Sequence, residues 1–155
     1  MKQEIIMLIT GLLGTVGFSI LFFLHPKRLP VAAAGGLLCC FVYLVMKRVT
    51  GNEFVANLVG ALAAELYAQA AARICKCPST VFTFPSVIPL IPGGMLYRTM
   101  SAIVNQEFAQ AGEFGMTTLT VVAGIAAGIS IGSIIVSLIS ASVSRRKNKK
   151  AGNKA

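Results

Sequence analysis

Long apolar stretches are the feature that most limits how this chain can fold. Several of them run for about 20 residues, the length of helix that crosses roughly 30 Å of hydrocarbon. The chain is 55% hydrophobic and only 12% charged, about half the charged share of an ordinary soluble domain. Its apolar residues come in continuous runs and do not alternate with polar ones, which favours helices over a barrel of strands. We therefore predict an all-α, polytopic helical membrane protein.

The apolar stretches predict about five transmembrane helices in one helical domain, residues 1-143. The expected spans are residues 5-24, 31-46, 54-72, 81-104 and 116-143, and a basic cytoplasmic tail follows at 144-155. The second span is short, and residues 47-52 after it are expected to form a loop. The fourth contains Pro85, Pro89 and Pro92. Each proline removes a backbone donor and disfavours a helical predecessor, so this span is expected to be broken.

Small residues at helical spacing predict which helix faces pack together. They recur every four positions in the third and the last expected spans, which lets a neighbouring helix approach closely. In the third span they are Ala56, Gly60, Ala64, Ala68 and Ala72, and in the last they are Gly124, Gly128 and Gly132.

Three polar side chains also share one face of the third span. Asn57, Glu65 and Gln69 lie at intervals of four or eight residues, beside the small residues. A carboxylate in the middle of a span is costly in lipid, so this face is expected to point into the bundle or a wet cavity. Three interpretations of Glu65 stay open: a proton-coupling carboxylate, an ion-pair partner of Arg98, or a buried structural residue.

The break in the fourth span is the candidate binding site. A broken membrane helix is tolerated where it is buried in protein or faces water, and in transporters the second half-helix points its free N–H groups at anionic substrates. Arg98, about one turn into that half, has the geometry to pair with a carboxylate. Pro92, Gly93, Gly94, Tyr97 and Arg98 together predict a seat for a small carboxylate at mid-membrane depth. The alternatives are a kink for packing alone and an arginine that reaches the membrane surface.

Charge predicts the orientation. Six of the fourteen basic residues lie between positions 145 and 154, directly after the last span, as is typical of a cytoplasmic flank. Five spans with this tail inside put the N-terminus outside, and they also put Lys27, Arg28, Arg73 and Lys76 inside. Binding of anionic lipid head groups is the smaller alternative role of the tail. Nucleic acid is not an expected partner, because no basic folded surface is present to carry it.

The residues for a metal or catalytic site are missing. Cys75 and Cys77 form a lone C-x-C, and the only histidine, His25, lies in another loop, whereas a metal site needs about four ligands. Cys39 and Cys40 lie in an apolar run and are expected to pack as small residues. With one histidine and no aspartate, the chain offers no hydrolase or transferase constellation. We expect no metal, no cofactor and no enzyme activity.

The residues around the break resemble a known family. Val81-Phe82-Thr83 followed by Val87-Ile88-Pro89-Leu90-Ile91-Pro92-Gly93 is similar to the "VFT…VIP…PG" signature of the bacterial threonine/serine exporter family, in its small-subunit branch. Residues 97-102, the Gly/Ser-rich final span and the short basic tail are similar too, so the resemblance covers most of the chain.

This resemblance implies an exporter of threonine and serine, or in some relatives of a dicarboxylate, driven by the proton-motive force. It implies a place in the bacterial cytoplasmic membrane and a larger partner subunit that supplies the other half of the exporter. Glu65 is the leading candidate for coupling to protons. A dicarboxylate exporter subunit and a non-transporting membrane scaffold are the alternative functions, and association of the chain with copies of itself is left open.

Overall fold

The computed structural model describes the backbone of residues 2–152 and the side chains of residues 4–142. Its elements are α1 (Lys2–Leu21), the 3-10 turn η1 (Pro26–Arg28), α2 (Leu29–Thr50), α3 (Glu53–Cys75), α4 (Thr80–Val87), the 3-10 turn η2 (Ile88–Leu90), α5 (Gly93–Val104) and α6 (Phe108–Gly152). Within this part of the chain, four helices are long and apolar enough to cross a membrane. The count is up to five if the pair 80–90 and 93–104, bent by 55°, is one span. The predicted all-α fold with a broken fourth span is confirmed.

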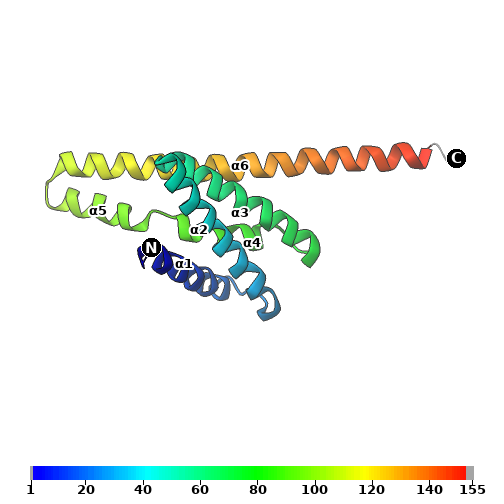
Figure 1. Cartoon of the computed structure of the whole chain (residues 1–155), viewed down its shortest axis with the longest axis horizontal. Coiled ribbons are helices and arrows are strands. Elements are labelled where there is room, and N and C mark those ends of the chain that lie inside the picture. Colours follow the sequence, from blue (N-terminus) through cyan, green and yellow to red (C-terminus); the bar gives the residue numbers. More distant parts are fainter. Residues whose placement is uncertain (1, 153–155) are drawn as a thin grey trace.

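The longest helix, α6, runs along one side of the bundle (Figure 1). α6 has 45 residues, so at 1.5 Å per residue it is about 68 Å long, more than twice the hydrocarbon thickness of a bilayer. α3 packs against its middle, and α5 lies alongside its N-terminal part (Figure 1). α2 packs against α3, and α1 and α4 pack against α2. The C-terminal part of α6 therefore extends past the other helices, whereas its N-terminal part is accompanied by α5 (Figure 1).

Several helices are longer than the apolar stretches that predicted them. Residues 47–50, expected in a loop, form the last turn of α2, and that part of the prediction is wrong. Lysine and arginine are good helix formers, so the helix continues into polar residues until Gly51, which ends it with φ of 65°. α6 likewise begins at Phe108, before the expected start of the last span. Where the hydrocarbon begins and ends along each helix stays a prediction, and Lys154 of the expected tail lies outside the described residues.

Glycines bring α6 into close contact with α3, as the G-x-x-x-G pattern predicted. A Cβ on Gly124 would lie 2.8 Å from the carbonyl oxygen of Phe54, and a Cβ on Gly132 would lie 2.8 Å from Cγ of Glu65. At Gly128 a Cβ would collide with the carbonyl oxygen of Leu58. The face of α3 that carries the polar stripe therefore packs against α6.

Close contacts also join α2 to its neighbours. Gly60, one of the small residues of α3, lies against Tyr43 and the carbonyl oxygen of Cys39. Nearer the N-terminus of α2, a side chain at Gly36 would collide with Thr15 of α1. Cys39 and Cys40 are fully buried, so their predicted packing role is confirmed.

Candidate functional site

Glu65 lies inside the bundle, where α3, α4 and α6 meet. The residue is 2% exposed. Its Oε2 accepts a hydrogen bond of 2.7 Å from the hydroxyl of Thr83. Its Oε1 accepts bonds of 2.8 Å from the hydroxyl of Ser133 and from the side-chain amide of Gln69. The predicted inward face of the third span is confirmed, and the carboxyl is held by donors from three helices.

The donors around Glu65 suit a carboxyl in either protonation state. A hydroxyl both donates and accepts, so its proton can turn toward another acceptor. The hydroxyl of Thr83 has such an acceptor, the carbonyl oxygen of Ser79 at 3.1 Å. When Glu65 carries a proton, Thr83 can donate to Ser79 and accept from Glu65. Within the described chain no lysine or arginine pairs with Glu65, so the ion pair with Arg98 is not formed.

The predicted seat residues do not all come together. Pro92 precedes α5 as its N-cap residue and is partly buried. Gly93 and Gly94 are exposed, and a Cβ on either would meet no atom within 4 Å. The side chain of Tyr97 is 74% exposed. Arg98 is exposed as well, and its guanidinium lies 5.9 Å from the centre of the Phe114 ring.

A pocket of about 200 Å³ lies beside the break, and we call it the break pocket. Residues 89–92 and Met95 line one part of it, and its polar lining is Tyr43, Glu53, Asn57 and Thr117. Met7, in the second turn of α1, lines it too. Glu53 is the first residue of α3, whereas Pro89 lies against Gly11 near the middle of α1, so the pocket reaches from one end of α3 to the first half of α1. The mid-membrane depth expected for the break stays a prediction.

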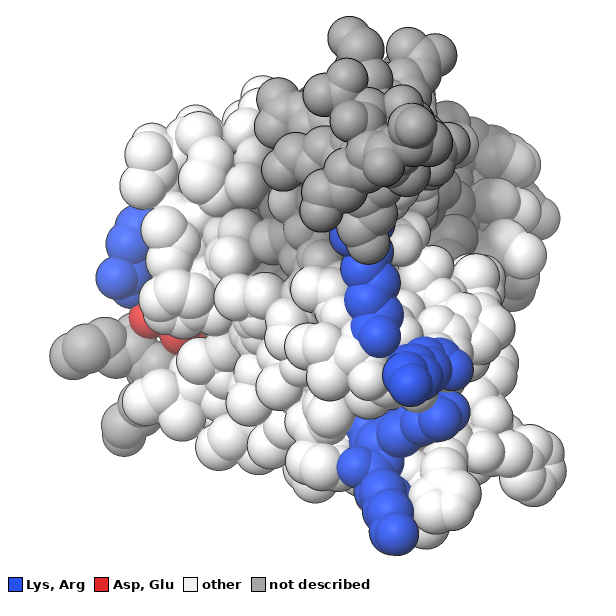
Figure 2. All heavy atoms as spheres, turned by 90° about the vertical axis from the view of Figure 1, so that its right-hand side faces the viewer, with Lys and Arg blue, Asp and Glu red and all other residues white. Residues whose placement is uncertain are grey.

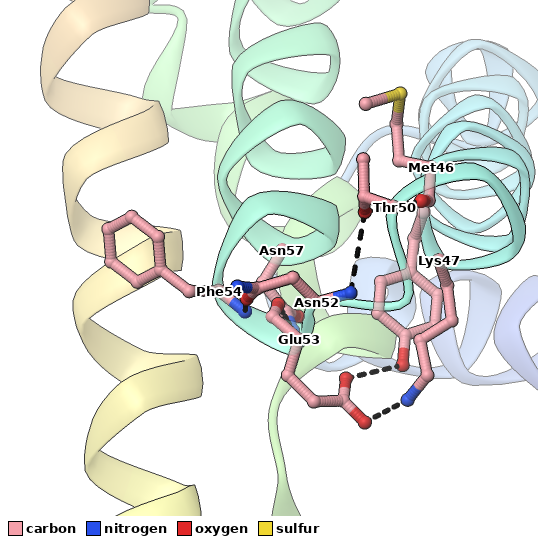
Figure 3. Close-up of polar contacts among 8 residues, drawn as sticks. Met46, Lys47, Thr50, Asn52, Glu53, Phe54 and Asn57 are labelled. Atoms are coloured by element: carbon pink, nitrogen blue, oxygen red, sulfur yellow. Dashed lines mark hydrogen bonds and ion pairs between the residues drawn. The ribbon is translucent and has the colours of Figure 1, made fainter.

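Glu53 organises the polar part of the break pocket (Figure 3). One carboxylate oxygen, Oε2, accepts a hydrogen bond of 3.1 Å from the hydroxyl of Tyr43, and the other forms an ion pair with Lys47. The side-chain amide of Asn57 donates to the backbone carbonyl of Glu53 at 2.8 Å. The side chain of Asn52 accepts from the backbone N–H of Phe54 at 2.9 Å and caps α3. These contacts tie the end of α2 to the start of α3.

A second pocket lies at the opposite end of the polar stripe. It has a volume of about 380 Å³, is open to its surroundings, and is lined by Gln69, Arg73, Lys76, Cys77 and Ser79 among others; we call it the basic pocket. Gln69 both lines this pocket and donates to Glu65, so a single hydrogen bond connects the buried carboxyl to it.

A larger groove between α1 and α2 has a different character. Its volume is about 440 Å³, and its lining is almost wholly apolar, with Ile5, Phe41 and Val45 among the residues. Glu4 and Arg48 are the charged residues of this lining, and they form an ion pair with each other. The groove suits a lipid chain better than a polar metabolite, because polar metabolites need convergent polar groups.

Sequence reasoning missed Glu53 and Tyr43 as pocket residues. Glu53 comes four residues before Asn57, so it belongs to the same stripe of α3, and that spacing was a signal. Tyr43, Thr83 and Ser133 lie on other helices. No spacing within one helix shows which side chains of another helix face it, so the sequence held no signal for these contacts.

The comparison with protein families identifies the chain. Residues 7–135 match the family described as "Threonine/Serine exporter, ThrE". This match includes the polar stripe, the break and the glycines of α6. No curated protein and no solved structure matches the chain. The chain therefore belongs to the threonine/serine exporter family, which makes it a multi-pass membrane protein of a transporter family and not an enzyme.

Proposed function

We propose that this chain is a membrane subunit of a secondary exporter whose substrates are threonine and serine. The observation that carries the proposal is the family match over residues 7–135. The broken span supports it, because the break borders a pocket with charged and polar lining. Drug-sized ligands occupy pockets of about 300 Å³ or more, so a volume near 200 Å³ favours a metabolite the size of a free amino acid.

The carboxylate of the substrate lies, in this proposal, at the start of α5. The N–H of Gly94 makes no hydrogen bond within the described part of the chain, and the space around Gly93 and Gly94 is open. Free N–H groups and the helix dipole favour an anion at such a position. Pro92 connects this helix start to the break pocket. A role for Tyr97 and Arg98 in substrate binding stays a prediction.

Glu65 is the proposed proton-coupling residue. It can keep hydrogen-bond partners in both protonation states, as its contacts with Thr83 show. Gln69 connects it to the basic pocket, whereas Ala61, fully buried against Gly128, lies between it and Asn57 of the break pocket. In this conformation the proton site is therefore reached from the basic pocket and is closed toward the break pocket.

The basic pocket marks the proposed cytoplasmic end. Arg28 donates to the carbonyl oxygen of Cys75 at 3.3 Å, which brings η1 beside the end of α3. Arg73 contacts Ser140 of α6 at the same end. Figure 2 shows lysine and arginine side chains together on this face with no acidic side chain among them. By the positive-inside rule this end faces the cytoplasm, and the N-terminus of α1 lies outside.

A larger subunit of the same family is the proposed partner. On α1, Gly14 and Gly17 have no atom within 4 Å of an added Cβ. Small residues on an uncovered face allow another membrane helix to approach closely. A second copy of this chain is the alternative occupant of that face.

The proposal is tested in cells that carry the chain. Cells fed with threonine- or serine-containing dipeptides release the free amino acids inside and must export them. Deletion of the chain should raise the internal threonine level and slow its appearance in the medium, and a plasmid copy should restore both. Succinate efflux is measured in parallel. If efflux of threonine, serine and succinate is the same with and without the chain, the non-transporting scaffold is the better account.

A further inference from the structure

The polar lining of the break pocket has unused capacity to bind a cation. A carboxylate has about four lone-pair positions, and Glu53 uses one for Tyr43 and one for Lys47. Asn57 is 2% exposed and lines the pocket, and its amide oxygen accepts no hydrogen bond within the described chain. The hydroxyl of Tyr43 donates to Glu53 and keeps its own lone pairs as acceptors. All three side chains therefore offer acceptors to the same small volume.

We propose that this pocket is the subsite for the α-ammonium group of a free amino acid, held by Glu53, Asn57 and Tyr43. An ammonium has three donors and no acceptor, which matches a site made of three acceptor side chains. The inference rests on the proposed function and adds to it the part of the site that recognises an amine. The carboxylate of the same molecule lies toward the start of α5, beyond Pro92.

This arrangement decides between the two substrate classes. A dicarboxylate would place a second negative charge beside Glu53, where like charges repel and neither is solvated as in water. A zwitterionic amino acid instead has opposite charges at its two ends. Lys47 reduces the charge of Glu53 without removing its open lone pairs. The subsite therefore favours amino acids over dicarboxylates.

The test is competition against labelled threonine in proteoliposomes that hold the chain with its co-purifying partner. The competitors are threonine, its amine-free analogue 2,3-dihydroxybutanoate, and succinate. For wild type, threonine should compete at least about tenfold more strongly than the analogue, because a hydrogen bond to a charged group contributes about 1.5–3 kcal/mol to binding. Glu53→Gln should raise the KM for threonine about tenfold or more and leave competition by the analogue unchanged. Glu107→Gln, an exposed acid near the start of α6, is the matched control and should resemble wild type.

Glu53 also holds α2 to α3, so Glu53→Gln could act through a folding defect. A second variant tests the subsite without changing those contacts. Asn57→Ala leaves the contacts of Glu53 with Tyr43 and Lys47 in place and should lower discrimination against the analogue by a smaller factor. Three results would overturn the subsite. The variants could lose affinity for threonine and for the analogue equally, or they could keep the wild-type KM for threonine. Wild type could also accept the analogue as well as it accepts threonine. If wild type transports threonine but the variants behave in one of these ways, the ammonium subsite is ruled out and the proposed function stands. A wild type that moves neither threonine nor serine removes the proposed function as well.

Discussion

The carboxyl of Glu65 lies inside the bundle, where a charge is costly, and hydrogen bonds from its neighbours stabilise it. Three donors from α3, α4 and α6 converge on its two oxygens. In lipid an unpaired carboxylate would be destabilising, and here hydrogen bonds replace the water that the group has lost. Removal of one donor should therefore be measurable as lost stability.

Thr83→Val is the sharpest test of this arrangement. Valine keeps the shape of threonine, and the change leaves Oε2 of Glu65 without the donor that the structure gives it. We expect a loss of about 1–3 kcal/mol in the free energy of unfolding, seen as a lower midpoint of thermal unfolding in mild detergent. Thr120→Val is the control, because the hydroxyl of Thr120 is exposed and donates to a carbonyl of its own helix. Equal midpoints for the two variants would contradict the role given to Thr83.

The polar stripe of α3 shows which features of the site a residue pattern can predict. Spacing of four predicted that Asn57, Glu65 and Gln69 share a face and that this face points inward, and burial of Asn57 and Glu65 agrees. The contact partners of Glu65 come from helices 18 and 68 residues away in sequence. Such contacts depend on how whole helices cross, and the spacing of residues within one helix carries no information about that crossing.

At the scale of the elements, helix ends were less predictable than helices. α1, α3 and α5 each end at a residue with positive φ that is not glycine: Phe23, Lys76 and Gln106. After each of them a backbone N–H returns to a carbonyl five residues earlier, at 2.8–3.1 Å, as in a Schellman ending. Glycine is the usual residue at the position with positive φ, and it is absent at these three helix ends, so the sequence carried no signal for them.

The glycines of α6 allow a direct test of helix packing. Gly128→Ala should separate α3 from α6 and lower the midpoint of thermal unfolding, because the added Cβ meets the backbone of Leu58. Gly112→Ala is the matched control in the same helix, with nothing within 4 Å of the new Cβ. There alanine should be neutral or stabilising by up to about 1 kcal/mol, since it is the better helix former. The close contact of α3 with α6 would be in doubt if both variants unfolded at the same temperature.

The start of α5 allows a test of function without a change in folding. Gly94→Leu adds a side chain in open space, so insertion and the unfolding midpoint should match wild type. The leucine should nevertheless block approach of a carboxylate to the N-terminus of α5 and lower threonine efflux at least about tenfold, the loss expected with one charged hydrogen bond. Wild-type efflux in this variant would remove the carboxylate seat from the account.

For the whole molecule, five spans and the charge distribution predict that the two termini lie on opposite sides of the membrane. In intact cells a peptide tag at the N-terminus should be reached by an added antibody. A tag at the C-terminus should be reached after the membrane is made permeable. Two tags on the same side would mean that the bent pair α4–α5 does not cross the membrane, and that four spans are present.

Threonine flux in proteoliposomes is the direct test of proton-coupled threonine export. Vesicles with the chain and its co-purified partner are loaded with labelled threonine and placed in an acidic medium. A gradient of about two pH units supplies about 2.7 kcal/mol per proton. Wild type should release threonine faster with the gradient than without it, whereas Glu65→Gln should release it at one rate under both conditions. Release by wild type that ignores the gradient, or an equal response in the variant, would contradict the account.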